Sequence, residues 1–305
     1  MRSAHVNLAL SMILVGLSVP TSKLVVSHVP PLAAAFLRFL MVALLLAPVA
    51  LRRGRGALPA STRDWISIVL LSLFGMVLFN VFLLFGLRAT SAVTAGILTS
   101  TIPAMTALCA ALVLGERIGA GTAGAIALAV LGILALNLQA GEGGADGAAE
   151  SLAGTLLVCG AVLSEALYGV FARRLGGRMR PLALTFLSNT LAAAMIAPAA
   201  AATARGFDPA AVPVEIWALF AGSGIGSGLI AVLLWMRGIA QVPASRAGLY
   251  TGLIPVAGVA AAVLVLGERL TPAHGLGLAC VLVAIALGTG VLRRRSAGAG
   301  LASRD

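Results

Sequence analysis

The stretch GLRATSAVTAGILTSTIPAMTALCAALVLGER, which runs from Gly86 to Arg117, returns as GIAQVPASRAGLYTGLIPVAGVAAAVLVLGER from Gly238 to Arg269. The two copies are offset by 152 residues without a gap, and 14 of their 32 positions are identical. Each copy carries a proline in the same register and ends in Leu-Gly-Glu-Arg, a pattern that apolar composition alone does not produce. The sequence therefore predicts an internal duplication, and a duplication of this kind decides the fold.

The duplication extends over nearly the whole chain. Trp65 and Trp217 keep the offset of 152, and upstream segments match at an offset of 150, as the single lysine Lys23 does with Arg173. The predicted units are a first repeat, an acidic glycine-rich linker, a second repeat and a basic tail, at residues 1–138, 139–151, 152–292 and 293–305.

The composition is that of a membrane protein. The chain is 60% hydrophobic, its mean hydropathy is +1.06, and 10% of its residues are charged, against roughly 25% in soluble domains. Ten apolar runs are long enough to cross a bilayer, which takes about 20 residues each. They lie near residues 5–27, 31–51, 64–86, 92–114, 121–138, 152–173, 182–202, 214–236, 245–266 and 273–292. We expect an all-α integral membrane protein with ten transmembrane helices.

The basic residues indicate how the chain is oriented in the bilayer. With the N-terminus placed in the cytoplasm, 16 of the 21 lysine and arginine residues fall on the cytoplasmic side, and the acidic linker falls outside. Cytoplasmic loops carry such an excess, and there is no separate basic domain that would suggest a nucleic-acid partner. We expect a multi-pass protein of the bacterial cell (inner) membrane with both termini in the cytoplasm.

The number of spans in each half has a consequence for the architecture. Five spans are predicted per half, so the second half enters the membrane upside down relative to the first. Inverted repeats are typical of secondary transporters, in which two pseudo-symmetric halves open a central site to each side in turn. The expected fold is therefore two inverted five-helix repeats around a central cavity.

Several of these features resemble the EamA family of the drug/metabolite transporter superfamily. They are the doubled segments ending in Leu-Gly-Glu-Arg, the repeated Pro103 and Pro255, and Arg38-Phe39 after Pro30-Pro31. The resemblance covers about residues 5 to 292. It implies a ten-helix inverted-repeat fold with a central cavity that exports or exchanges amino acids, metabolites or cationic drugs. The family is broad, so a particular substrate does not follow.

The repeated prolines are predicted to mark hinges. Pro103 removes the helix hydrogen bond to the carbonyl of Thr99, and Pro255 does the same to Thr251. Polar backbone at mid-membrane is tolerated only where protein or a water-filled cavity covers it. One interpretation is a pair of hinged helices that border the substrate pathway, with the two threonines as contacts. The other is a structural kink repacked by neighbouring helices.

The two Gly-Glu-Arg turns are predicted to end helices. Glycine stops the apolar run, and Thr271-Pro272 starts the next helix as its N-cap and first residue. We expect Glu116 and Glu268 to cap helix ends and to pair with arginine near the membrane interface. A direct part in transport is the alternative.

Glu165 is the predicted centre of the substrate site because it lies about 13 residues into the sixth span. A charged group at the bilayer centre costs roughly 2.5–3.5 kcal/mol, so it usually faces an interior cavity and serves a function. There it can attract a cationic or amino group, or carry a proton. Arg38, at comparable depth, can bind a substrate carboxylate or hold Glu165 in an ion pair. Tyr168 lies three residues further on the same helical face.

Four other polar or amphipathic side chains within spans complete the predicted substrate contacts, namely Asn80, Asn189, Trp235 and Tyr250. Each of them alone also fits an interhelical hydrogen bond or an interface anchor. The three histidines are far apart in sequence, and the three cysteines lie within apolar spans. We therefore expect no metal site, no cofactor and no disulfide.

Three functions compete at this stage. The first is transport of a small-molecule substrate, with uniport, proton antiport and exchange all open. The second is a membrane-embedded enzyme, which would need several ionisable groups at one depth or a metal motif, whereas the sequence offers one deep acid, one deep base and no histidine pair. The third is a flippase of lipid or lipid-linked sugar on the same fold. Transport is the prediction, and the chain is not expected to be an enzyme.

Overall fold

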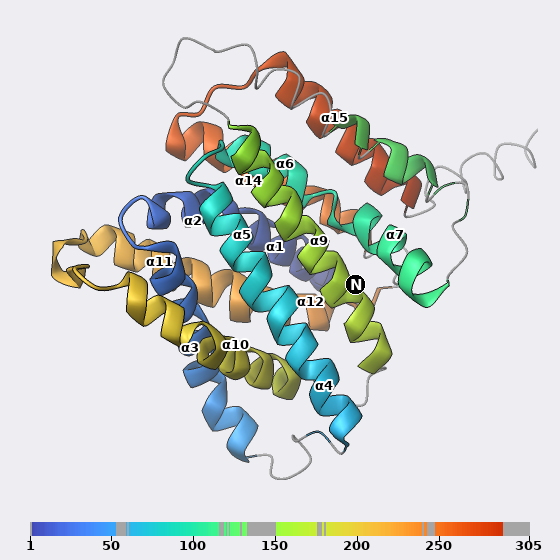
Figure 1. The fold of residues 1–305 in the computed structure, drawn as a ribbon. Coiled ribbons are helices and arrows are strands. Elements are labelled where there is room, and N and C mark those ends of the chain that lie inside the picture. The colour runs from blue at the N-terminus through green and yellow to red at the C-terminus, as the bar shows by residue number, and fades with distance from the viewer. Residues whose placement is uncertain are drawn as a thin grey trace, which may run out of the picture.

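The regular structure of the described residues is entirely helical (Figure 1). The computed structural model describes residues 2–52, 59, 61–115, 119, 121, 123–128, 130–132, 151–175, 179, 181–239, 241–242 and 248–288. The predicted linker up to residue 150 and the predicted tail lie outside them. The helices are α1 (Arg2–Gly16), α2 (Ser18–Val26), α3 (Pro31–Arg52), α4 (Thr62–Leu71), η2 (Ser72–Leu78), α5 (Phe79–Gly86), α6 (Ala92–Thr99), α7 (Ile102–Leu114), α9 (Leu152–Leu175), α10 (Pro181–Thr203), η3 (Pro209–Ala211), α11 (Val214–Ile225), η4 (Gly226–Ile230), α12 (Ala231–Ile239), η5 (Gly248–Gly252), α14 (Leu253–Leu266) and α15 (Pro272–Gly288).

Within this part of the chain, six helical stretches are long and apolar enough to cross a membrane. They are Ser3–Val26, Pro31–Pro48, Thr62–Gly86, Leu152–Ala172, Leu182–Thr203 and Val214–Trp235. The bent pair α6 and α7 brings the number to seven when it counts as one span. Shorter apolar helices at Ala123–Gly132, Tyr250–Leu266 and Pro272–Leu287 stand where the fifth, ninth and tenth spans are expected. The all-helical membrane class is confirmed, whereas ten transmembrane helices stay a prediction.

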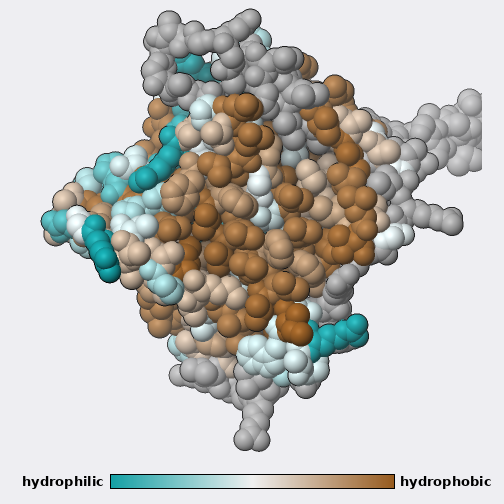
Figure 2. Space-filling view, in the orientation of Figure 1, coloured by the Kyte–Doolittle hydropathy of each residue, from teal (hydrophilic) through white to brown (hydrophobic). Residues whose placement is uncertain are grey.

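The surface supports the same class. Apolar residues cover most of the face shown in Figure 2, with hydrophilic residues gathered toward its edges. The repeat-equivalent Leu112 and Leu264 are 77% and 83% exposed. Proteins surrounded by water rarely expose apolar patches larger than a few hundred Å², whereas a bilayer supplies lipid contacts for such side chains. The chain is therefore a multi-pass membrane protein.

The two repeats pack on each other through equivalent contacts. α9 lies along α5 (Figure 1), and in the opposite pairing α1 lies along α12. Gly86 approaches α9 so closely that a Cβ there would lie 2.8 Å from Val158 Cγ2. Gly238, its repeat equivalent, approaches α1 in the same way, since a Cβ would lie 2.5 Å from Leu8 Cγ. Leu8 and Val158 are themselves repeat equivalents at the offset of 150, so the two halves make matching contacts here.

Each repeat also carries a π-helical segment that the sequence does not predict. A shift of 152 residues places η4 on residues 74–78, which lie inside η2. η2 packs against α9 and α10 of the opposite repeat, and η4 packs against α1. Single-turn π segments within α-helices are rare and occur frequently at functional sites. Because the two π segments occupy matched positions, the helices that they contact, α9, α10 and α1, are candidates for the functional site.

The repeated prolines lie at helix starts, which corrects the predicted local geometry. Pro103 is in the first turn of α7, and α6 and α7 meet at an angle of 41°. Pro255 is the third residue of α14, which follows the 3-10 turn η5. The first N–H groups of a helix have no intrahelical partner, so a proline there removes no hydrogen bond. Pro103 is exposed and Pro255 is buried, and their part as hinges stays a prediction.

The predicted helix ends at the two Gly-Glu-Arg turns are confirmed. α7 and α14 end immediately before Gly115 and Gly267, whose φ angles are +70° and +67°. Glycine adopts this left-handed conformation without the steric cost that a Cβ brings. α15 begins at Pro272 as expected, and Thr271 Oγ1 accepts a hydrogen bond from the His274 backbone N–H at 3.3 Å.

Candidate functional site

Glu165 lies within α9, on the helix face opposite its exposed leucines. Leu156 and Leu163 are 61% and 45% exposed. Glu165 is two positions beyond Leu163, a rotation of about 200° around the helix, and it is half-buried. Among the described residues its carboxylate makes no hydrogen bond and no ion pair within 4.0 Å. The side chain is thus an acid without a protein counter-ion in a candidate membrane span.

Tyr168 packs against the first π segment. Its ring lies directly over Gly75 of η2, where any Cβ would collide with it. The same ring contacts the apolar cluster built around Ile68 and Leu71 of α4. Tyr168 therefore connects the helix of Glu165 to the third span of the opposite repeat, and the absence of a side chain at Gly75 allows this contact.

Arg38 lies at the second π segment. Its Nη2 donates a hydrogen bond to Ser227 Oγ of η4 at 2.9 Å, and Ser227 Oγ donates in turn to the Ser223 carbonyl at 2.7 Å. Arg38 is half-buried, and no carboxylate of the described residues lies within 4.0 Å of its guanidinium. The alternative of a Glu165–Arg38 ion pair is therefore not formed in this structure.

The predicted amide and hydroxyl contacts bond mostly to their own helices. Asn80 Nδ2 donates to the Met76 carbonyl at 2.9 Å, and Asn189 Nδ2 donates to the Thr185 carbonyl at 2.8 Å. Thr99 Oγ1 donates to the Ala95 carbonyl at 2.9 Å. Such bonds satisfy a hydroxyl or an amide within the bilayer without any contact to a substrate. Thr251 lies half-buried in η5.

Tyr250 and Trp235 form a separate group that packs against the N-terminal helix α1. The Tyr250 hydroxyl is 2.7 Å from His5 Nδ1. Tyr250 and Trp235 pack on a small cluster of Ala4, Leu8 and Val242. These two side chains thus belong to the contact between the N-terminal helix and the second repeat, and sequence reasoning did not identify His5 as a partner.

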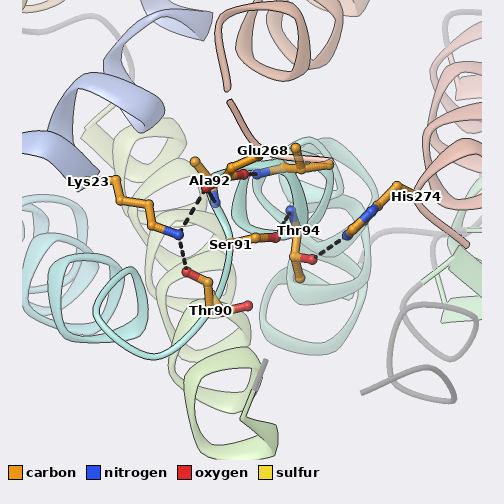
Figure 3. A network of polar contacts seen from close by, with 8 residues as sticks. Lys23, Thr90, Ser91, Ala92, Thr94, Glu268 and His274 are labelled. Atoms are coloured by element: carbon orange, nitrogen blue, oxygen red, sulfur yellow. Dashed lines mark hydrogen bonds and ion pairs between the residues drawn. The ribbon is translucent and has the colours of Figure 1, made fainter. Parts of the chain in front are cut away.

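A polar network at the start of α6 joins the two repeats (Figure 3). The Glu268 carboxylate accepts hydrogen bonds from the backbone N–H groups of Ala92 and Val93, each at 2.9 Å. Lys23 Nζ forms an ion pair with Glu268 Oε1 at 2.9 Å and donates to the Thr90 carbonyl at 2.9 Å. An acid is favoured here because a helix N-terminus carries unpaired N–H groups and a partial positive charge.

His274 adds a second connection beside this network (Figure 3). It is 6% exposed, and its Nδ1 accepts the Thr271 backbone N–H at 3.1 Å. The proton of a neutral imidazole is therefore assigned to Nε2, which donates to Thr94 Oγ1 of α6 at 3.0 Å. The second repeat thus holds α6 of the first at two points, through Glu268 between α14 and α15 and through His274 in the first turn of α15.

The network corrects one sequence prediction. Glu268 does cap a helix, but the helix is α6 of the other repeat, and its charged partner is Lys23 rather than arginine. Glu116, for which the same role is expected, lies outside the described residues. Lys23 and Glu268 both have equivalents in the other repeat, Arg173 and Glu116, but no pattern in the sequence pairs Lys23 with Glu268.

The described residues hold no group of three histidine, cysteine or acidic side chains that could bind a metal ion. What the arrangement offers is a deep acid, a deep base and a polar connection between the halves. Charges within a bilayer most often serve a substrate or ion pathway. The geometry therefore favours binding and movement of a charged ligand.

Comparisons with known proteins show the family and the fold of the chain. The profile of the EamA-like transporter family matches residues 2–138 and again residues 152–289. Uncharacterized transporter YetK of Bacillus subtilis (strain 168) is 33% identical over 92% of this chain and 84% of its own length. An uncharacterized transporter of Archaeoglobus fulgidus is 26% identical over 94% of this chain and 98% of its own length. A solved crystal structure shares the fold, with a TM-score of 0.63 and 24% identity over 96% of this chain and 99% of that one.

Proposed function

The chain belongs to the EamA-like transporter family, and we propose that it is a secondary transporter that exports or exchanges small metabolites, amino acids or cationic drugs by alternating access. It is a membrane transporter and not an enzyme, as the sequence predicts. We further propose ten spans in two inverted halves, in the bacterial cytoplasmic membrane, with both termini in the cytoplasm.

The observation that carries this proposal is a pair of opposite charges that have no charged partner among the described residues. Glu165 and Arg38 both lie in candidate membrane spans, and neither forms an ion pair with a described residue. Each such charge costs roughly 2.5–3.5 kcal/mol at the centre of a bilayer. A substrate amino or cationic group at Glu165, and a substrate carboxylate at Arg38, would replace the missing counter-charges. A proton on Glu165 would neutralise it between substrates.

The remaining predicted contacts rank behind these two. Tyr168 shares the helix of Glu165 and contacts η2. Asn80, Asn189 and Thr99 are engaged by their own helices. Tyr250 and Trp235 belong to the cluster at the N-terminal helix. We propose Tyr168 as the next substrate contact, because an i, i+3 pair lies on one helical face.

Transport by the reconstituted protein tests the proposal. Vesicles containing the chain are loaded with a panel of amino acids and cationic drugs, and efflux is measured with and without a pH gradient. Glu165→Gln keeps the size of the side chain and removes its charge. Because a hydrogen bond to a charged group contributes about 1.5–3 kcal/mol, we expect transport to fall roughly ten- to hundredfold, or to lose its dependence on pH between pH 5 and pH 8.

The matched control is Glu215→Gln, since Glu215 is an exposed acid at the start of α11. It should transport like the parent protein. Equal transport by the Glu165→Gln variant at every pH would reduce Glu165 to a structural residue. Movement of labelled lipid without movement of any panel compound would replace the transporter by a flippase.

A further inference from the structure

The second repeat is connected to the start of α6 through two of its residues, Glu268 and His274. Glu268 binds two backbone N–H groups of α6 and the ammonium of Lys23. His274, six residues further along the chain, holds Thr94 of the same helix. Ser91 completes the site, because its Oγ accepts the Thr94 backbone N–H at 3.0 Å. Segments 245 residues apart are thereby joined through charged groups.

The network lies at one end of the helical bundle. Lys23 is in the last turn of α2, Ala92 begins α6, and Glu268 follows the end of α14. In the proposed orientation this end faces outward. Of the second repeat, α6 packs against α9, α14 and α15, so an opening between the repeats beside α6 has to separate it from at least one of these helices.

The bonds of the network are of a kind that can open and close. The side chains of Lys23 and Glu268 are 26% and 14% exposed, so water can replace their mutual bonds without passing through a dry core. Separating a fully buried ion pair would cost much more free energy, because each charge would lose its partner without gaining contact with water. α6 itself has eight residues and is separated from α7 by the 41° bend, so it can move without carrying α7 rigidly with it.

We propose that Lys23, Glu268 and the N-terminus of α6 form a latch that holds the two repeats together at this end and releases whenever the transporter opens there. The proposal rests on the proposed function. The structure is then a state closed at the latch. The Glu268 carboxylate is its central group, because it bonds to α2 and α6 at once.

Labelling of a buried cysteine tests the latch without any knowledge of the substrate. Val93 is 0% exposed and contributes only its backbone to the network, so Val93→Cys reports opening at this point. The reporter is placed in a protein whose three native cysteines are replaced by alanine, in sealed vesicles. A membrane-impermeant maleimide is then applied to each side. We expect Glu268→Gln to speed labelling from one side about tenfold, which corresponds to about 1.4 kcal/mol.

Three controls separate opening at this end from a general loosening of the fold. Cys109 is buried within α7, and in a protein that retains only this cysteine Glu268→Gln should leave its labelling slow. Ser27→Cys is an exposed position beyond α2, and its labelling should be fast in both backgrounds. Glu215→Gln should not change the rate at Val93→Cys.

An unchanged rate at Val93→Cys in the Glu268→Gln background would overturn the latch. Faster labelling of Cys109 by the same factor would also overturn it, because the network would then stabilise the whole fold and not this end alone. If the labelling responds as expected while no panel compound is transported, the proposed function fails and the latch stands.

Discussion

Two regions of this molecule treat charge in opposite ways. In the helices that span the membrane, Glu165 and Arg38 have no charged partner among the described residues. At the start of α6, Glu268 is bonded to Lys23 and to two backbone N–H groups. The sequence offered a counter-ion for Glu165 in Arg38, and the fold places that arginine on Ser227 instead.

The difference teaches what each region is suited to do. Partners that are already in place lower the free energy of one arrangement of the helices, and so they favour a particular conformation. A charge within the membrane that has no charged partner can be stabilised by a ligand or a proton that binds to it. We therefore propose that the interior charges bind a ligand and that the paired charges control the conformation.

The largest expected effect is on transport, at Arg38. Arg38→Gln keeps a donor for Ser227 and removes the positive charge. If a substrate carboxylate binds there, the loss of a charge-assisted bond should reduce transport roughly ten- to hundredfold. Efflux of anionic or zwitterionic compounds from vesicles measures this. Arg205→Gln, at an exposed position after α10, is the control, and equal efflux by both variants would remove Arg38 from the site.

The second expected effect is that neutralising Glu165 and neutralising Glu268 change the free energy of unfolding in opposite directions. Neutralising Glu165 removes an unpaired charge, so Glu165→Gln should raise the free energy of unfolding. Glu268→Gln weakens bonds to Lys23 and to α6, so it should lower that free energy by about 1–3 kcal/mol. Unfolding of both variants in the same detergent gives the comparison. A loss of stability in Glu165→Gln would mean that this acid has a structural partner, and the contrast between the regions would collapse.

Sequence reasoning reached the parts of the fold that depend on neighbouring residues. The apolar runs located the helices, and glycine at positions 115 and 267 located two helix ends because a left-handed residue is needed there. The repeat predicted two similar halves, and the matched approaches of Gly86 and Gly238 agree with that.

It did not reach the features that depend on distant contacts. The partner of Glu268 is 245 residues away in the sequence, and no local pattern distinguishes Lys23 from an arginine at a helix end. The π segments have no composition of their own, because they differ from an α-helix only in which carbonyl accepts each bond. The repeated prolines predicted a bend in both halves. The described residues show a 41° bend between α6 and α7 beside Pro103, whereas Pro255 follows the 3-10 turn η5.

The smallest expected effect separates the two functions of Glu268. Lys23→Gln removes the ion pair and leaves the carboxylate on the N–H groups of Ala92 and Val93. Because the pair is partly exposed, it should contribute about 0.2–1 kcal/mol, less than the loss expected for Glu268→Gln. A double-mutant cycle with Lys23→Gln and Glu268→Gln measures the coupling directly. Coupling within that range would show that the helix N-terminus contributes most of what holds Glu268. If Lys23→Gln lowered the free energy of unfolding as much as Glu268→Gln, the ion pair would instead be the main bond of the latch, and the N-terminus of α6 would contribute little.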